Sequence, residues 1–266
     1  MTIAIAHDYL TQRGGAERVV LSMAAAFPEA PIHTLLYEPA TTFPEFDSIS
    51  VRPSPLNRLP LLRRNHRLAF PILAAAASRT HVEADVVVCS SSGWAHGVDT
   101  SGAKVVYCHA PARWLYQSDV YLRELGAGAR AAAHALHGPL VRWDRRAAGT
   151  AERYLVNSSH VARLVRDVYG IEPEILPPPP VLTPGGARRQ VEGIEPGFVL
   201  CVSRLLAYKN VDVVVEAFRQ LPGERLVVVG DGPDAERLAA LRAPNVTLLG
   251  AVDDATLRWL YAGAAG

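Results

Sequence analysis

The stretch FVLCVSRLLAYKNVDVVVEAF, residues 198–218, joins a continuous apolar run to a charged loop and a helical pattern. Four apolar residues of its second half recur at the i, i+3, i+4, i+7 spacing of one helix face: Val211, Val214, Val215 and Phe218. The first half lacks polar alternation, which is typical of a strand with both faces buried in a parallel sheet. The stretch therefore predicts a strand at Phe198–Val202, a loop and a helix.

The same kind of unit recurs along the chain. Seven further β-branched runs, each followed by a turn signal, predict strands at Thr2–Ala6, Ile32–Tyr37, Asp85–Cys89, Lys104–Cys108, Arg153–Val156, Arg225–Val229 and Asn245–Leu249. In the segment NSSHVARLVRDVYG, the serines after Asn157 supply a capping hydroxyl for a helix that ends at Gly170. Strands that alternate with helices favour parallel sheets, so we expect an α/β protein.

A proline-rich stretch divides the chain. Four consecutive prolines follow Leu176, and a segment rich in glycine and polar residues continues to Gly197. Consecutive prolines cannot continue a helix or a central strand, so they make a stiff, extended spacer. We therefore expect a first domain at residues 1–176, a linker at 177–196 and a second domain at 197–266.

Composition limits the class of protein. With 49% hydrophobic and 20% charged residues among 266, the chain is long enough for one large or two ordinary domains. The formal net charge of +1 leaves no overall field that would attract nucleic acid, so no nucleic-acid partner is expected. The three cysteines form no CxxC pair and lie in apolar runs, which favours buried thiols in a reducing cytoplasm.

Targeting and membrane signals are weak. No basic region precedes a long apolar stretch at the N-terminus. The longest uncharged apolar window, residues 68–77, is too short to cross a bilayer core of about 30 Å. We therefore expect neither a signal peptide nor a transmembrane helix, and a cytoplasmic location.

Two loops of the first domain carry candidate site residues. Open α/β sheets bind ligands beyond the carboxyl ends of their strands, where loops expose backbone N–H groups and helix N-termini. Gly14 and Gly15 lie after the first strand at a helix entrance, where a phosphate can approach the backbone, but a plain helix-entry turn fits equally well. His109 follows the strand KVVYC, where it could donate to a bound hydroxyl or be a structural histidine.

Two loops of the second domain carry the others. Arg204 and Lys209 lie immediately before a helix N-terminus, so two cations and free N–H groups meet where a pyrophosphate would fit. The alternative is that both are solvated surface charges. After the strand RLVVV, Gly230 and Gly232 form a glycine turn that leads into a helix at the same carboxyl edge.

Five segments occur in order over nearly the whole chain: HDYLTQRGGAE, CHAPARWLY, NSSHVARLV, SRLLAYKN and VGDGP. Together they make the sequence resemble the GT4, or group 1, glycosyltransferases, and within these the bacterial mannosyltransferases of O-antigen and exopolysaccharide synthesis. The resemblance implies a GT-B fold with two Rossmann-like domains and parallel sheets. It also implies a retaining hexosyltransferase whose substrate is a GDP- or UDP-linked sugar, with no separate cofactor.

The resemblance implies roles for the candidate residues. Gly14 and Gly15 would approach the donor diphosphate and the acceptor, and His109 would line the sugar site. Arg204 and Lys209 would bind the pyrophosphate and stabilise it as it leaves.

The remaining loops are assigned to the nucleoside. By the same resemblance, two loops would approach the nucleoside: Gly230–Pro233, which contains Gly232, and Ala251–Val252. The aspartates near these loops lack the context of a D-x-D metal site, so we expect no obligatory divalent metal.

The sequence departs from the family pattern at its end. The family's E-x(7)-E element, whose glutamates hold the donor sugar and ribose, should follow DATLRWLYAGAAG, but the sequence stops at Gly266. We therefore expect that on the order of a hundred residues of the second domain are absent and that this chain alone is inactive. Two rival interpretations stay open: a non-catalytic fragment, and another Rossmann-type sugar-nucleotide enzyme such as an epimerase, against which SRLLAYKN argues.

A basic stretch suggests where the acceptor could be met. Residues 56–77 combine leucines and a phenylalanine with four arginines: Arg58, Arg63, Arg64 and Arg67. The resemblance implies a glycan or polyprenyl-linked acceptor, and a basic amphipathic stretch can lie on an anionic membrane surface. An ordinary helix with a solvated basic face fits equally well.

Overall fold

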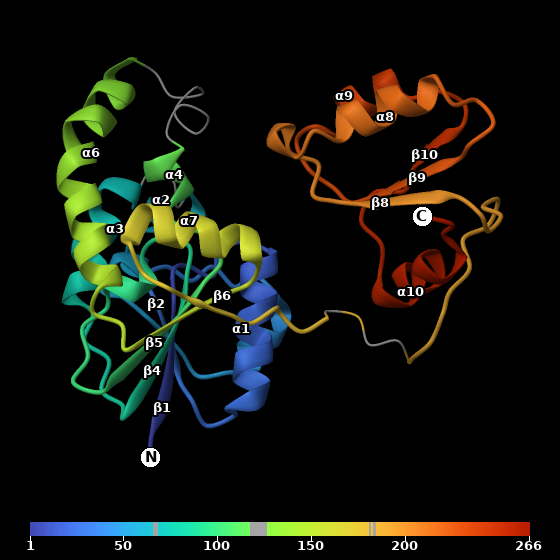
Figure 1. Cartoon of the computed structure of the whole chain (residues 1–266). Coiled ribbons are helices and arrows are strands. Elements are labelled where there is room, and N and C mark those ends of the chain that lie inside the picture. Colours follow the sequence, from blue (N-terminus) through green and yellow to red (C-terminus); the bar gives the residue numbers. More distant parts are fainter. Residues whose placement is uncertain (66–68, 118–126, 181, 183–184) are drawn as a thin grey trace. The chain divides into compact units, whose positions relative to one another are not determined.

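The structure, a computed structural model, describes residues 1–65, 69–117, 127–180, 182 and 185–266. These residues form two units, Met1–Pro179 (unit 1) and Pro180–Gly266 (unit 2), so the division falls within the run of prolines. Each unit has a parallel β-sheet covered by helices, which confirms the predicted α/β class (Figure 1).

Unit 1 contains a seven-stranded parallel sheet with the order β3-β2-β1-β4-β5-β6-β7. Its strands are β1 (Ile3–His7), β2 (Ile32–Thr34), β3 (Val51–Pro53), β4 (Val86–Ser91), β5 (Ala103–Cys108), β6 (Arg153–Val156) and β7 (Glu174–Ile175). The five strands predicted here are all present. The sequence does not reveal β3 and β7, because these two edge strands are very short and largely exposed and therefore have no apolar run.

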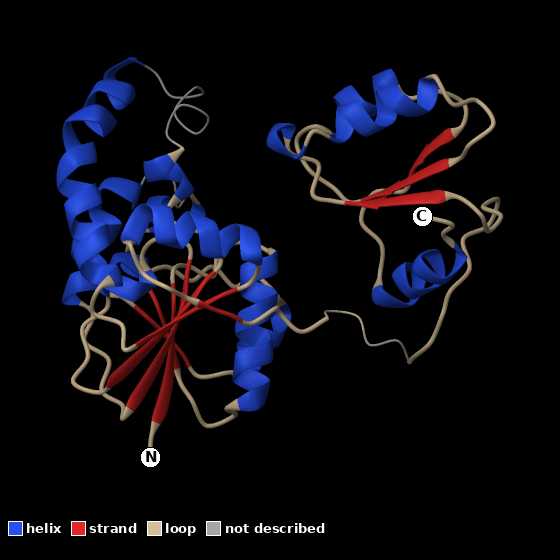
Figure 2. Cartoon of the chain, viewed as in Figure 1, coloured by secondary structure: helices blue, strands red, loops and turns tan. Residues whose placement is uncertain are grey.

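Helices cover both faces of this sheet (Figure 2). They are α1 (Gly15–Ala26), α2 (Pro60–Arg64), α3 (Phe70–Arg79), α4 (Arg113–Tyr116), α6 (Ala127–Ala148) and α7 (Ser159–Tyr169), with short 3₁₀ turns η1 (Pro44–Ser48), η2 (Pro55–Arg58) and η4 (Ala95–Gly97). Ile5 of β1 packs with Val20 of α1. Its neighbours Ala4 and Ala6 lie in the cluster that contains Val161 of α7. Because successive strand residues point to opposite faces, α1 and α7 bury opposite faces of the sheet.

The two ends of α7 are as predicted. Ser158 Oγ accepts a hydrogen bond from the Val161 N–H at 3.3 Å. Gly170, with a φ of 67°, ends the helix in the left-handed conformation. The local sequence is therefore sufficient to determine where this helix begins and ends.

Unit 2 contains a three-stranded parallel sheet with the order β10-β9-β8, and all three strands were predicted. The strands are β8 (Val199–Val202), β9 (Leu226–Val229) and β10 (Val246–Leu248), and the helices are α8 (Val211–Arg219), α9 (Ala235–Leu241) and α10 (Asp254–Gly263), with a 3₁₀ turn η5 (Ala207–Lys209). Val215 of α8 and Leu238 of α9 share one buried cluster. Leu260 of α10 packs with Phe198 in another, so α10 covers the opposite face (Figure 2).

The second half of the predicted linker is not a free spacer. Ile194 is buried with Phe198 in a cluster of unit 2. The Arg189 N–H donates to the Ala255 carbonyl at 3.0 Å, and the Arg189 guanidinium pairs with Asp253. These contacts tie residues 189–196 to unit 2, because an apolar side chain within a polar stretch gains free energy when it joins the core.

A buried carboxylate ties the loop after β1 to the loop after β4. Asp8 accepts hydrogen bonds from the backbone N–H groups of Ser92 at 2.6 Å, Trp94 at 3.0 Å and Ala95 at 2.6 Å. The Asp8 side chain is 2% exposed, so water does not compete for these bonds. Buried backbone N–H groups need an acceptor, and the Asp8 carboxylate is the acceptor for all three of these groups. Asp8 thus holds two loops of the carboxyl edge in one conformation.

In unit 2, the loops after the three strands pack through their backbones. A Cβ atom on Gly230 would collide with the Ser203 carbonyl oxygen, and one on Gly232 would collide with that of Leu205. Gly230 has a φ of 139°, which also disfavours a side chain. Its N–H donates to the Gly250 carbonyl at 2.8 Å, which brings in the loop after β10. Close packing among loops therefore requires glycine at both positions.

We expect Asp8→Ala to lower the free energy of unfolding of unit 1 by at least about 2 kcal/mol. Three N–H groups would lose their acceptor, and a buried unsatisfied group costs about 1–3 kcal/mol. Urea unfolding followed by tryptophan fluorescence measures the change. The control is Asp167→Ala on the exposed surface of α7, for which we expect a change within about 0.5 kcal/mol. Equal effects of the two substitutions would contradict the role given to Asp8.

We expect Gly230→Ala to increase hydrogen–deuterium exchange across residues 226–250 and to leave unit 1 unchanged. An alanine at position 230 would be destabilising because of its positive φ, and displacing the Ser203 carbonyl should add about 1–3 kcal/mol to that cost. The control is Gly250→Ala, because Gly250 also has a positive φ, 71°, but has no atom near its Cβ position. Its expected cost is about 1–2 kcal/mol. If the two variants exchange alike, the packing argument is wrong.

Candidate functional site

Three neighbouring strands end together in unit 1. The parallel register pairs His7 of β1 with Ser90 of β4, and His109 directly follows β5. His7 Nδ1 lies 3.0 Å from the carbonyl oxygen and 3.0 Å from Oγ of Ser90. Ser90 Oγ lies 2.8 Å from His109 Nε2. The three side chains therefore form a hydrogen-bonded row at the carboxyl edge of the sheet, which we call the His–Ser–His row.

His109 is held as a neutral ring. Burial is the largest cause that lowers its pKa to about 3, followed by the nearby His7 and Arg113. Its carbonyl oxygen accepts a hydrogen bond from Asn157 Nδ2 at 3.0 Å, which holds the backbone in place. A neutral imidazole has one N–H donor and one acceptor, so His109 suits a hydroxyl ligand better than a phosphate.

The glycine loop of unit 1 stands over a buried acid. Glu17, in the first turn of α1, is 1% exposed, and Gln12 Nε2 donates to its Oε1 at 3.1 Å. Its Oε2 has no hydrogen-bond partner among the described residues. A Cβ atom on Gly14 would lie 2.5 Å from this oxygen, so a larger residue there would displace the end of the Glu17 side chain. Gly15 begins the helix. The carboxylate opposes the attraction of the helix N-terminus for an anion, and it favours a hydroxyl ligand over a diphosphate at this loop.

Two exposed cations lie at the end of β8 in unit 2. In the part of the chain that the structure describes, neither Arg204 nor Lys209 is paired with a carboxylate, and Lys209 Nζ lies 5.4 Å from the centre of the Tyr208 ring. Asn210 follows with a φ of 52°, and α8 begins at Val211. Two cations without a paired carboxylate in a loop that leads into a helix N-terminus can bind an anion such as a diphosphate.

The structure distributes the predicted site residues between the two units. Val252 is half-buried and packs against the cluster of Leu260, so part of its side chain belongs to the core. The carboxyl edge of the unit 2 sheet carries Arg204, Lys209, Gly230, Gly232 and Val252 in its loops. The carboxyl edge of the unit 1 sheet carries Gly14, Gly15 and His109.

Sequence reasoning missed the residues that support these positions. Asp8 and Glu17 lie within the quoted segment HDYLTQRGGAE, and Ser90 begins the run SSS at the carboxyl end of β4. Each is a polar residue at the carboxyl end of a buried strand or in the first turn of the following helix, which is a usable signal. For Asp8 and Ser90, the meaning of this signal depends on partners more than 80 residues away: Asp8 bonds to residues 92–95, and Ser90 bonds to His7.

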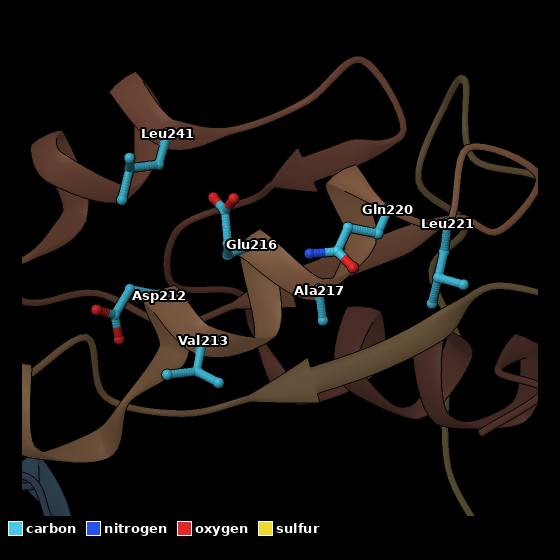
Figure 3. A pocket seen from close by; sticks show the side chains of 7 residues that line it. All are labelled: Asp212, Val213, Glu216, Ala217, Gln220, Leu221 and Leu241. Atoms are coloured by element: carbon cyan, nitrogen blue, oxygen red, sulfur yellow. The ribbon is translucent and has the colours of Figure 1, made fainter.

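A groove of about 730 Å³ lies elsewhere on unit 2 (Figure 3). It is lined by the outer face of α8 and the end of α9: Asp212, Val213, Glu216, Ala217, Gln220, Leu221 and Leu241. None of the predicted site residues lines it. The groove runs along the helix instead of across the strand ends, so it is distinct from the candidate site.

The basic stretch of unit 1 is partly described. Arg58 ends η2, and Arg63 and Arg64 end α2, whereas Arg67 lies outside the described residues. Arg63 Nε donates to Glu38 Oε2 at 2.7 Å, but Arg58 and Arg64 are exposed. Among the helices that the structure describes, none is long and apolar enough to cross a membrane.

Comparison with solved structures supports the fold. The chain is similar to Anabaena Alr3699/HepE in complex with UDP, with a TM-score of 0.62 and 15% identity over 99% of this chain and 72% of that chain. The complex of the same protein with UDP-glucose gives a TM-score of 0.62 at 16% identity, with the same coverage. The apo lipopolysaccharide outer core galactosyltransferase WaaB gives 0.50 at 16% identity, over 95% of this chain and 69% of that chain. The predicted GT-B fold class is confirmed.

Family models cover both units. No curated protein matches the sequence. Residues 196–265 match the model for Glycosyl transferases group 1. Residues 13–179 match the model for Glycosyltransferase Family 4. Because this match spans well over half of the chain, the protein belongs to Glycosyltransferase Family 4.

Proposed function

We propose that the protein transfers a sugar, with retention, from a UDP- or GDP-linked donor to a glycan or polyprenyl-linked acceptor. The observation that carries this proposal is the pair Arg204 and Lys209, two exposed cations in the loop between β8 and α8 in a chain of this family. The structures of the similar Anabaena protein contain UDP and UDP-glucose, which supports a nucleotide-linked donor. The motif resemblance favours a hexose, mannose in particular.

The charges of unit 2 suit the departure of a diphosphate. When the bond from the anomeric carbon to the phosphate oxygen breaks, negative charge develops on that oxygen. Cations placed near this oxygen lower the barrier, because their attraction to it is stronger in the transition state than in the ground state. Arg204 and Lys209 are the proposed cations. The loops at Gly230, Gly232 and Val252 are the proposed contacts of the nucleoside.

The residues of unit 1 suit the sugar and the acceptor. His109 is neutral, so it contributes a hydrogen bond to a sugar hydroxyl without a charge. Gly14 and Gly15 expose backbone beside the Glu17 carboxylate, which favours an acceptor hydroxyl. We place the anion on unit 2 and the hydroxyl contacts on unit 1, because the buried Glu17 carboxylate and the neutral His109 ring suit hydroxyl groups.

We also propose that the edge formed by η2 and α2 contacts an anionic membrane where lipid-linked acceptors lie. Arg58 and Arg64 are exposed, and between them Leu59 is 51% and Leu61 is 67% exposed. Exposed leucines between exposed arginines fit a surface that inserts apolar side chains below lipid phosphates. Arg63 is less suited than Arg58 and Arg64 to contact a lipid phosphate, because Glu38 already pairs with it.

We expect Arg204→Ala and Lys209→Ala each to weaken binding of the diphosphate to the full chain by about 10- to 100-fold. Loss of a hydrogen bond to a charged group costs about 1.5–3 kcal/mol. Calorimetric titration with UDP and with GDP identifies the base and measures the effect. The control is Arg242→Ala, an exposed arginine that precedes β10 at the opposite edge of the sheet. A loss below threefold for both loop variants would exclude diphosphate binding by this loop.

For the membrane surface, we expect Arg58→Gln/Arg64→Gln to reduce co-sedimentation with vesicles containing anionic lipid. The expected loss is about 1 kcal/mol per charge, and it should shrink as salt is added. Arg79→Gln/Arg163→Gln, which removes the same charge from exposed positions of α3 and α7, is the control. Equal losses in the two double variants would point to net charge rather than to this surface.

A further inference from the structure

The His–Ser–His row determines the direction of its own hydrogen bonds. His7 and Ser90 are 3% and 0% exposed, so their bonds are made within the protein. His7 Nδ1 lies 3.0 Å from the Ser90 carbonyl oxygen, and a carbonyl oxygen can only accept. His7 must therefore carry a proton on Nδ1 and donate it towards Ser90.

The Ser90 hydroxyl transmits this direction to His109. His7 Nδ1 is equally close to Ser90 Oγ, so the hydroxyl oxygen accepts from His7. A hydroxyl has a single proton to donate, and among the described residues the only other hydrogen-bond partner of Ser90 Oγ is His109 Nε2 at 2.8 Å, so a proton on Nε2 would leave this buried hydroxyl proton without an acceptor. Nε2 is then an acceptor and carries no proton. Since burial keeps the pKa of His109 low and the ring neutral, its one ring proton lies on Nδ1.

We propose that Ser90 and His7 are positioning residues that hold His109 in the neutral tautomer with its proton on Nδ1. In the part of the chain that the structure describes, Nδ1 has no hydrogen-bond partner, so this N–H is available to a ligand oxygen. His109 therefore acts through Nδ1 as a hydrogen-bond donor and cannot take up a proton there as a general base. That the ligand oxygen belongs to a sugar rests on the proposed function.

The neighbouring serine provides a matched control on the same strand. Ser91 Oγ lies 2.8 Å from His96 Nδ1 and accepts from the Gly93 N–H at 3.1 Å. His96 Nε2 lies 3.0 Å from Asp144 Oδ1, and all three side chains of this group are at most 1% exposed. Because Ser91 and Ser90 point to opposite faces of the sheet, each serine serves a different histidine.

The tautomer is measured directly on the ¹⁵N-labelled full chain. Long-range ¹H–¹⁵N correlation spectra distinguish a protonated from an unprotonated ring nitrogen, and His109→Asn identifies the His109 signals by their loss. We expect a protonated Nδ1 and an unprotonated Nε2 for His109, and a protonated Nδ1 for His7. A His109 proton on Nε2 in the unaltered protein would overturn the proposal, whether or not any variant folds.

Three serine variants test the role of the hydroxyl. Ser90→Ala removes the donor to His109 but keeps the Ser90 carbonyl, so His109 should become a mixture of tautomers while His7 stays unchanged. Ser90→Thr restores the hydroxyl and should restore a single tautomer. Ser91→Ala should alter His96 and leave His109 unchanged. An unaltered His109 in Ser90→Ala, or an equal change in Ser91→Ala, would refute the row.

Ligand binding by the same variants separates this inference from the proposed function. With whichever of UDP-glucose and GDP-mannose the unaltered protein binds, Ser90→Ala should weaken the nucleotide sugar several-fold and leave the free nucleoside diphosphate unaffected. If the tautomer changes and sugar-nucleotide affinity does not, the sugar contact assigned to His109 is wrong and the row stands. If neither changes, the row is refuted.

Discussion

Parallel pairing between β1 and β4 places His7 beside Ser90, and the site of unit 1 depends on this register. Side chains alternate between the two faces of a strand, so a shift of one residue would bring Ser91 into the place of Ser90. The cores on both sides of the sheet prevent such a shift, because it would also move Ala4, Ile5 and Ala6 to the wrong faces. The apolar packing of the sheet thus determines a hydrogen-bond arrangement at its edge.

Asp8 extends this control from the strands to the loops. The residue after β1 is a buried acid whose three bonds shape the turn after β4, and that turn leads to η4 and His96. Unit 2 reaches the same result by another route, since Gly230 and Gly232 let the backbones of neighbouring loops touch. Both units hold their strand-end loops rigid, one with a carboxylate and the other through the absence of side chains.

The two units differ in the charge they present at their strand ends. Burial keeps His109 neutral and Glu17 stands beneath the glycine loop, whereas Arg204 and Lys209 are exposed and uncompensated by described carboxylates. These side chains of unit 2 therefore favour an anion, and those of unit 1 favour a hydroxyl group. Such a division suits a reaction in which charge develops on one part of a substrate and hydrogen bonds orient another.

The sequence by itself determined the strands with an apolar run, the ends of α7 and the helix stripe of α8, because each depends on neighbouring residues or on a local period. It also placed His109, Arg204 and Lys209 at strand ends. Only the tertiary structure decided what surrounds them: the bonds of Asp8, the row from His7 to His109 and the contact of Gly230 with Ser203. The short strands β3 and β7 were also decided only by the tertiary structure. Their pairing partners lie on other strands, and no local pattern encodes a contact between residues far apart in the chain.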